Sequence, residues 1–366
     1  MNSYNFKTLI ERYEENYDFV NNEANEEIFK CKAVQHFRDV WFSDFRKNHD
    51  FAASFNAARK ESSVMIDNSR ISPTSGIVKM AEKEPEEVER LFNEVLLAED
   101  NGDIKIRHKN MESFLGGIEA IRQKHFSQFW KYKQDRYAAS CYLTFFAPEK
   151  NFIYRYSEAE DFANYIEFGK DIGSGADFKL EVYYELCELI VEELKKYPSL
   201  IAKYRELTAS DEYYKDESLH IMAFDLMYCC RCYNFYKDLS HASKKDSIKE
   251  YKIEQAKEQE EKEKQEQRET IESKIYELEK ELEQFEDISL LDVTVSHKSY
   301  GEGIVVEQQI NKIKVRFKDI EKSFIINKKF IMRPTFENDT EIVEAFTEYD
   351  SIKDEIGRLK RESARI

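Results

Sequence analysis

The sequence predicts a multidomain, mainly α-helical protein with a small β-hairpin in its N-terminal part and a small five-stranded β-barrel near its C-terminus. Three observations support this fold class. Apolar residues recur every three or four positions over most of residues 1–243, residues 257–270 contain no apolar side chain, and the apolar period changes to two after Asp287. We therefore expect a helical domain at 1–243, a charged helix at 244–287, the barrel at 288–336 and an amphipathic helix at 337–366.

The N-terminal domain shows helical periodicity with strong aromatic content. Val34, Phe37, Trp41 and Phe45 follow one another at spacings of three and four, which is typical of a helix with one buried stripe. A proline at position 85, followed by acidic residues, indicates the start of another helix. Further helices are expected at 114–132, 157–169 and 181–198, the last ended by Pro198.

Three segments of this domain interrupt the helical pattern. Residues 71–78 (ISPTSGIV) contain helix breakers, and residues 101–110 indicate a loop or a short extended piece. Residues 141–157 hold two short aromatic and β-branched runs around Ala-Pro-Glu-Lys-Asn, which predicts a hairpin. Ser157, with Glu160 three positions later, predicts a capping box at the start of the next helix.

Residues 244–287 differ sharply in composition from the domain before them. The stretch without apolar residues cannot pack against a core, so we expect a solvated helix that separates two folded parts. A short heptad seam follows at Ile271, Ile275, Leu278, Leu282 and Phe285. The C-terminal helix carries a matching stripe and is expected to pack on this seam or on another protomer, giving a homodimer through 271–285 and 342–359. That stripe comprises Ile342, Phe346, Tyr349, Ile352, Ile356 and Leu359.

The segment from 288 to 336 predicts the barrel. Strands are expected at 293–297, 302–309, 312–318, 322–326 and 329–333. Ile310 and Asn311 would form a tight hairpin, and Gly301 and Gly303 would permit a sharp bend.

Charge and cysteine content narrow the functional classes. The net charge of −17 excludes a surface that attracts nucleic acid or an anionic membrane everywhere, so charge has to be considered by segment. We expect a cytoplasmic protein without a secretory signal, a membrane segment or a structural disulfide. The cluster Cys229, Cys230 and Cys232 lacks a second ligand pair, so buried thiols are favoured over a metal site. No catalytic constellation, cofactor motif or phosphate-binding loop is present.

Two basic segments are candidates for binding. Residues 101–137 carry eight Lys or Arg against four acids, interleaved with aromatic residues, which suits stacking on bases and neutralising phosphates. The alternative is a helix with a buried aromatic stripe and a solvated basic face. The nucleic-acid-binding candidates are Arg122, Lys124, Trp130, Lys131, Lys133 and Arg136. In the barrel, alternation places basic residues opposite Ile313, Val315 and Phe317. The docking candidates there are Tyr300, Lys312, Lys314, Arg316 and Lys318.

The barrel segment resembles a known module. SHKSYGEGIVV, KIKVRF and KSFI are similar to the Tudor-like C-terminal domain of the UvrD and PcrA helicases, with His297, Tyr300, Gly301, Gly303 and Val305 at the matching positions. The resemblance covers about 45 residues. It implies a small barrel that docks a protein or a nucleic acid, with protein as the favoured partner.

Residues 28–195 resemble a second family, the N-terminal module of McrB-like AAA+ restriction proteins, through FKCKAVQHFRDVWF, MAEKEPEEVERLFNEVLL and DRYAASCYLTFF. The resemblance implies a module that recognises a target, while a motor and a partner nuclease carry out the reaction. The missing phosphate loop means that no motor activity carries over. The resemblance implies a recognition module whose motor or nuclease is a separate protein.

Together these features predict a non-catalytic target-recognition or adaptor component of a bacterial DNA-restriction or anti-phage defence system, with DNA or RNA as ligand. The alternative is a dimeric interaction scaffold without nucleic-acid binding. An enzyme with an aromatic pocket near Tyr142, Tyr154 and Tyr156 is a third hypothesis, but no acid–base pair can be named for it.

Overall fold

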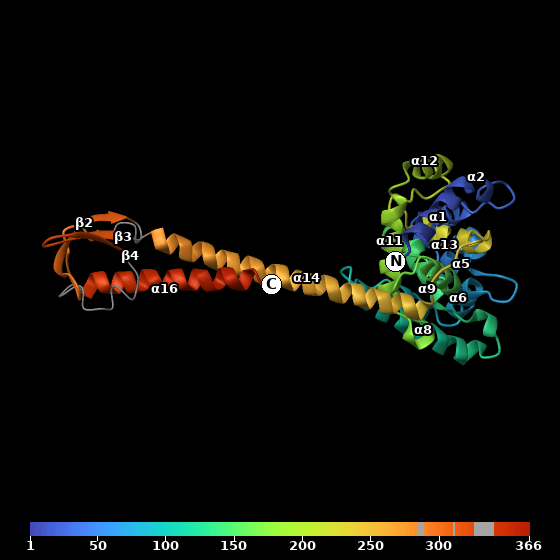
Figure 1. Ribbon diagram of the computed structural model, residues 1–366. Helices are drawn as coiled ribbons and strands as arrows, with labels where there is room; N and C mark the ends of the chain where they lie inside the picture. The colour runs from blue at the N-terminus through green and yellow to red at the C-terminus, as the bar shows by residue number, and fades with distance from the viewer. Residues whose placement is uncertain (284–288, 310–311, 326–339) are drawn as a thin grey trace. The chain divides into compact units, whose positions relative to one another are not determined.

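The computed structural model describes residues 1–283, 289–309, 312–325 and 340–366 (Figure 1). The chain divides into two compact units, Met1–Ile253 (unit 1) and Glu254–Ile366 (unit 2). The predicted mainly helical character is confirmed. Within the described ranges, no helix combines the length and apolar content needed to cross a membrane.

Unit 1, all of which the structure describes, consists of helices, turns and loops without a strand. Its longer helices are α1 (Ser3–Glu15), α3 (Phe29–Trp41), α5 (Phe51–Ile66), α6 (Pro73–Ala81), α8 (Ile104–Phe126), α9 (Arg136–Phe146), α10 (Tyr156–Tyr165), α11 (Leu180–Leu194), α12 (Pro198–Leu207), α13 (His220–Cys232) and the first part of α14 (Lys244–Glu283). Shorter pieces are α2 (Tyr17–Val20), α4 (Asp44–Asn48), α7 (Pro85–Arg90), η1 (Leu91–Leu96), η2 (Trp130–Tyr132), η3 (Pro148–Lys150) and η4 (Gly175–Asp177).

The core of unit 1 is built largely from aromatic rings. Phe37 of α3 is fully buried, and its ring centre lies 4.9 Å from that of Phe145, 5.7 Å from Trp41 and 6.0 Å from Phe55. Val34, on the same helix face, is buried too, so the predicted stripe is confirmed for Val34, Phe37 and Trp41. It is wrong for Phe45, which lies in the separate helix α4 and is 38% exposed. Because each buried aromatic side chain contributes roughly 1.5–3 kcal/mol, this cluster fixes α3, α5 and α9 against one another.

The predicted hairpin at 141–157 is wrong. Residues 141–146 belong to α9, residues 148–150 form η3, and residues 151–155 have no regular structure. Asp135 begins α9 by accepting a hydrogen bond from the N–H of Ala138 at 2.9 Å. All residues from Ala138 to Phe145 are buried. A helix buried on every side lacks a polar stripe, so its sequence looks like that of a buried strand.

Two predicted interruptions also prove helical, because polar or proline residues begin helices there. Pro73 occupies the first turn of α6, where its missing N–H costs nothing. The side chain of Asp103 accepts hydrogen bonds from the first N–H groups of α8, which begins at Ile104. Similarly, α11 ends at Leu194, and Pro198 begins α12 instead of ending α11.

The predicted capping box at Ser157 and Glu160 is wrong as well. Helix α10 begins at Tyr156, and Arg155 instead of Ser157 occupies the cap position, without a side-chain cap. The carboxylate of Glu160 accepts a hydrogen bond from Lys244 at 2.8 Å instead.

Unit 2 contains an open antiparallel sheet of four described strands, in the order β1 (Thr294–His297), β2 (Gly301–Gln309), β3 (Lys312–Phe317) and β4 (Glu321–Ile325). The predicted closed five-stranded barrel is therefore wrong, since β1 and β4 pair with one neighbour each and not with each other. The expected strand at 329–333 and the expected turn at 310–311 lie outside the described residues. The core of the sheet comprises Leu290, Val295, Val305, Ile313, Val315 and Phe317.

Two glycines shape the beginning of β2 for different reasons. Gly301 has φ of +76°, a conformation that residues with a Cβ rarely adopt. Gly303 lies inside the strand, and a Cβ there would come within 2.7 Å of the side chains of Val315 and Phe317. The first glycine allows the turn, and the second allows the core to pack close to the backbone.

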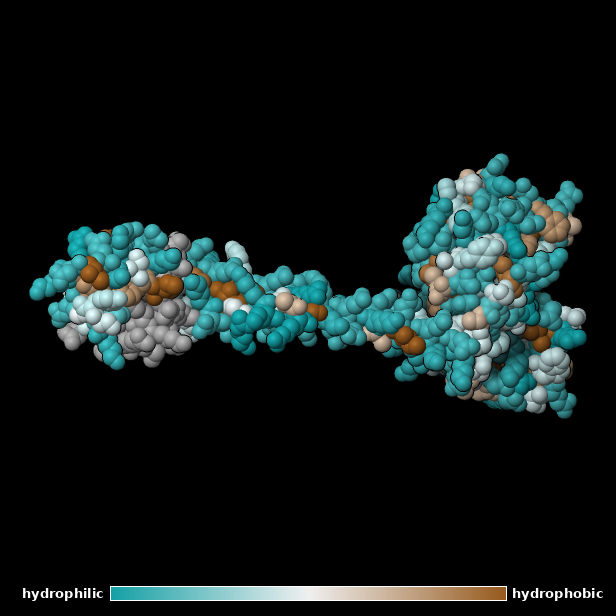
Figure 2. Space-filling model, viewed as in Figure 1, coloured by the Kyte–Doolittle hydropathy of each residue, from teal (hydrophilic) through white to brown (hydrophobic). Residues whose placement is uncertain are grey.

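Every residue of α14 from Lys252 to Thr270 is exposed, and hydrophilic residues cover most of this part of the helix in Figure 2. Within unit 2, α16 (Thr340–Ser363) lies beside the C-terminal part of α14 and runs in the opposite direction (Figure 1). Lys360 Nζ lies 2.7 Å from Glu279 Oε1, and Ile356 and Leu359 are buried. The seam residues Ile271, Ile275, Leu278 and Leu282 are half-buried. Phe285 and the side chains of Ile342 and Phe346 lie outside the description.

Candidate functional site

Three of the six predicted nucleic-acid-binding residues form ion pairs with Glu side chains of unit 1. Arg122 is buried, donates to both carboxylate oxygens of Glu119 and reaches the carbonyl of Phe126 at 3.3 Å. The Arg122 guanidinium lowers the pKa of Glu119 to about 2. Arg122 therefore caps the C-terminal end of α8, and its charge is already balanced by Glu119.

The other two engaged residues form ion pairs nearer the surface. Lys124 Nζ lies 2.6 Å from Glu84 Oε1, and Arg136 Nε lies 2.5 Å from Glu112 Oε1. The predicted positive charge of 101–137 is therefore partly neutralised by acids, one of them, Glu84, outside that segment.

The remaining three candidates project from the segment Phe129–Lys133, here named the basic–aromatic loop. Phe129 and Trp130 are 49% and 61% exposed, and Lys131 and Lys133 are exposed too. The Tyr132 ring stacks on Phe129 with centres 5.6 Å apart. Two cationic and two aromatic side chains thus face solvent together.

The backbone of this loop is held firmly against α6. The N–H of Ser72 donates to the carbonyl of Lys131 at 2.8 Å, and the buried side chain of Gln134 donates to the carbonyl of Tyr132 at 2.9 Å. Gly76 allows the close approach, because a Cβ there would come within 2.8 Å of Tyr132 Cβ. The exposed side chains are therefore carried by an ordered backbone.

The basic face of the sheet in unit 2 is also partly neutralised. Arg316 Nε lies 2.8 Å from Glu321 Oε1, and Lys314 Nζ lies 3.5 Å from Glu307 and 3.6 Å from Glu321. Hydrogen bonding from Arg316 lowers the pKa of Glu321. The other predicted docking residues, Tyr300, Lys312 and Lys318, are exposed.

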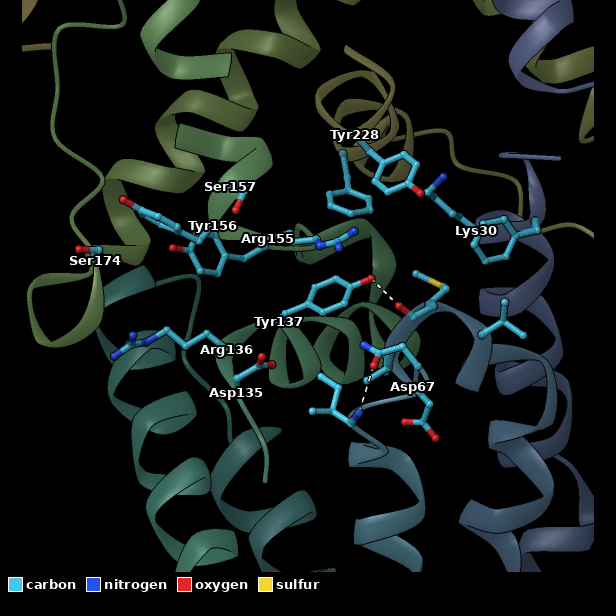
Figure 3. Close-up of a pocket in the computed structure, with 18 of the residues that line it drawn as sticks. Lys30, Asp67, Asp135, Arg136, Tyr137, Arg155, Tyr156, Ser157, Ser174 and Tyr228 are labelled. Carbon is cyan, nitrogen blue, oxygen red and sulfur yellow. Dashed lines mark hydrogen bonds between the residues drawn. The ribbon is translucent and has the colours of Figure 1, made fainter. Parts of the chain in front are cut away.

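A cavity of about 590 Å³ opens in unit 1 between α3, α9, α10, α13 and the chain after α5 (Figure 3). This volume lies in the range of small-molecule sites. Its lining is Phe29, Lys30, Val64, Met65, Ile66, Asp67, Asn68, Ile71, Asp135, Arg136, Tyr137, Tyr154, Arg155, Tyr156, Ser157, Ser174, Gly175, Phe224 and Tyr228. Tyr154 and Tyr156 belong to the aromatic pocket that the sequence suggested, but Tyr142 lies in the core instead.

Arg155 is the central cation of this cavity. Its guanidinium lies 5.5 Å from the ring centre of Tyr137 and 5.8 Å from that of Tyr228, both cation–π distances. The ring of Phe224 contacts both tyrosine rings, at 6.4 and 6.2 Å. The hydroxyl of Tyr137 donates to the carbonyl of Met65 at 2.6 Å, which fixes its ring, as Figure 3 shows.

Lys30, at the other side of the cavity, is committed to the protein itself. Its ammonium donates to Glu27 and to Asp225, at 2.6 Å from the latter, and only 4% of its side chain is exposed. Burial alone would lower the pKa of Lys30, but the charges of Asp225 and Glu27 outweigh it and raise that pKa. Lys30 therefore stays charged and paired.

The cysteines of the cluster 229–232 do not form a metal site in the part of the chain that the structure describes. Cys229 and Cys230 are buried and Cys232 is exposed; burial raises the pKa of both buried thiols. Among the described residues, no three His, Cys, Asp or Glu side chains are arranged to hold a metal ion.

Sequence reasoning did not find Arg155, Tyr137 and Tyr228 as a site. Tyr137 lies on α9, Tyr228 on α13 and Arg155 just before α10, so that only the tertiary fold brings them together. The available signal was weak: an Arg flanked by Tyr154 and Tyr156 in the sequence.

Comparison with known proteins adds no assignment. No protein-family model, no curated protein and no solved structure matches the chain. Both resemblances stated for the sequence stay predictions.

Proposed function

We propose that this protein is a non-catalytic recognition and adaptor protein whose unit 1 binds nucleic acid through the basic–aromatic loop. The observation that carries the proposal is the exposure of Trp130 and Phe129 beside Lys131 and Lys133 on a loop with a fixed backbone. Bases of any sequence stack on such rings, and phosphates attract the lysines. Single-stranded DNA or RNA is the ligand this combination favours, because its bases are free to stack.

The biological system in which this binding would act is proposed from the sequence alone. The resemblance of residues 28–195 to the module of McrB-like proteins supports target recognition in restriction or anti-phage defence. A separate motor or nuclease would then supply the chemistry. Unit 2 would dock that partner through the exposed residues of its sheet, such as Tyr300, Lys312 and Lys318.

The test is binding of labelled single- and double-stranded DNA and RNA to the full chain at about 50 and about 200 mM salt. We expect single strands to bind best, with affinity that falls as salt rises. The double variant Lys131→Glu/Lys133→Glu should reduce the salt slope by about one unit per lysine. Trp130→Ala should weaken binding about 5- to 150-fold through lost stacking.

A matched control comes from the end of α11. Lys195→Glu/Lys196→Glu reverses the same number of charges on another surface of unit 1 and should change specific binding little. If both double variants weaken binding equally, the loop is not the interface. If no nucleic acid binds at either salt concentration, this part of the proposal is wrong.

A dimeric scaffold is a second candidate, favoured by one observation in unit 2. The seam residues of α14 are only half-buried beside α16, and Tyr276 on the same helix is 70% exposed. A second copy could cover this surface. The mass in solution tests it: a dimer that Leu278→Glu/Leu282→Glu converts to monomer supports the scaffold, and a monomeric wild-type chain contradicts it.

A further inference from the structure

The cavity of unit 1 contains one cation whose charge is incompletely balanced. Lys30 and Arg136 each contact carboxylates at hydrogen-bonding distance. Arg155 reaches Glu158 only at 3.4 Å. The second carboxylate oxygen of Glu158, Oε2, is buried and has no hydrogen-bond partner in the part of the chain that the structure describes. The pairing of Arg155 with Glu158 is therefore weak in geometry and open to competition from another anion.

The two acids that line the cavity compete little for Arg155, because both cap helices. Asp67 accepts hydrogen bonds from the N–H and hydroxyl of Thr74 in α6. Asp135 accepts one from the N–H of Ala138 in α9. Both acids of the lining are therefore directed to helix N-termini. Since Lys30 and Arg136 are paired with acids outside the lining, Arg155 is the basic side chain of the cavity that is open to a ligand.

Helix α10 adds positive potential on the same side. It begins at Tyr156 without a side-chain cap, and Tyr156 and Ser157 both line the cavity. The N–H groups of a first turn favour an anion nearby, and the carboxylate of Glu158 in this same turn offsets part of that effect. Figure 3 shows Arg155 above the Tyr137 ring, with Tyr156 and Ser157, the next two residues of the chain, beside it.

The aromatic lining favours a ligand that carries a ring as well as an anion. Arg155 lies over the half-buried rings of Tyr137 and Tyr228, and Tyr156 is 44% exposed at the cavity. The buried ring of Phe224 packs against both tyrosine rings. Inorganic phosphate alone would leave these rings uncovered. A planar ring attached to the anion would bury them, with gains from apolar contact and stacking.

We infer that this cavity binds a small anion joined to a planar ring, of the nucleoside monophosphate class. Arg155 donates to the phosphate, and the accessible rings of Tyr137, Tyr228 and Tyr156 contact the base. The site is separate from the basic–aromatic loop and does not depend on the nucleic-acid binding proposed for that loop.

Isothermal titration calorimetry of the full chain with AMP and CMP tests this inference, with adenosine and inorganic phosphate as partial probes. We expect at least one nucleotide to bind with Kd below about 1 mM. Adenosine and phosphate should each bind at least tenfold more weakly. Arg155→Gln should weaken nucleotide binding about 10- to 100-fold, since a charged donor to the phosphate is lost, whereas Glu158→Gln should strengthen it because a competing carboxylate is removed.

Two comparisons keep the result interpretable. Arg231→Gln removes an exposed arginine of unit 1 that pairs with Asp161, and it should leave nucleotide affinity unchanged. The urea midpoint of Arg155→Gln, measured by tryptophan fluorescence, shows whether the variant is folded. Trp130→Ala should reduce oligonucleotide binding and leave AMP binding intact, so the two proposals fail separately. Absence of nucleotide binding, equal binding of phosphate alone, or a folded Arg155→Gln that binds normally would overturn the inference.

Discussion

Removal of the buried charge of Lys30 is expected to destabilise unit 1 strongly. The ammonium donates to Glu27 and to Asp225, and these three side chains are 4%, 7% and 10% exposed. Tyr13 donates to the other oxygen of Asp225 at 2.5 Å, and Tyr233 donates to Glu27 at 2.7 Å. The ammonium of Lys30 thus balances the buried carboxylates of Glu27 and Asp225, to which the tyrosine hydroxyl groups donate hydrogen bonds but no charge.

The magnitude follows from which charge stays behind. Lys30→Met leaves two carboxylates buried without a cation, and breaking a buried ion pair in this way costs about 3–5 kcal/mol. Glu27→Gln leaves the pair of Lys30 with Asp225 intact, so we expect it to cost much less, about 1 kcal/mol. The two variants should therefore differ several-fold in their effect on the free energy of unfolding.

Urea unfolding followed by tryptophan fluorescence measures this effect. Both tryptophans, Trp41 and Trp130, lie in unit 1, and Trp41 is buried, so its emission reports unfolding of that unit. Lys32→Met is the control on the same helix: its side chain is 41% exposed and lies 3.6 Å from Glu212. Such a surface change should stay within about 0.5 kcal/mol of wild type. A Lys30→Met free energy within about 1 kcal/mol of wild type would refute the reasoning.

Three further predictions concern other parts of the fold. Asp216→Asn should lower the free energy of unfolding of unit 1 by about 2–3 kcal/mol in the same assay, because the carboxylate accepts hydrogen bonds from three N–H groups at the start of α13; an unchanged urea midpoint would contradict this role. Hydrogen bonding from Arg107 lowers the pKa of Asp100, so this pair stabilises the fold above the ordinary aspartate pKa of about 3.9 and loses its effect as the pH falls through the lowered value. The stability difference between wild type and Asp100→Asn should accordingly be present at neutral pH and shrink in acid, and a difference that is independent of pH would exclude the charge effect. Leu359→Glu should separate α16 from α14 and make the chain after residue 253 sensitive to limited proteolysis, and retained resistance would show that the helix contact does not depend on this residue.

The sequence was sufficient wherever one face of an element is buried and the other is wet. The spacing of Val34, Phe37 and Trp41 identified the buried face of α3, and the alternation of Ile313, Val315 and Phe317 identified that of β3. It was insufficient where an element is buried on all sides. In α9, continuous burial from Ala138 to Phe145 removes the periodicity, and a strand was predicted instead of a helix.

For the candidate sites, the sequence did not reveal which charged side chains are already paired within the fold. A count of basic residues did not reveal that Arg122 and Arg136 are bound to Glu119 and Glu112, although the pair at spacing three is visible in the sequence. The contact of Arg155 with Tyr137 and Tyr228 could not be foreseen, since it depends on how distant helices pack. The closed barrel was predicted from the number of short strands and from the resemblance to the Tudor-like domain. Neither specifies whether the first strand of this chain pairs with the last.

The most direct test of the recognition role is the fluorescence of Trp130 during titration with a single-stranded oligonucleotide. Trp41 is buried in the core, so any quenching by stacked bases should come from Trp130, which is exposed on the basic–aromatic loop. We predict saturable quenching in the wild-type chain, weakened by higher salt and abolished in Trp130→Phe. Emission that does not change on addition of any oligonucleotide, or quenching that persists in Trp130→Phe, would contradict the account.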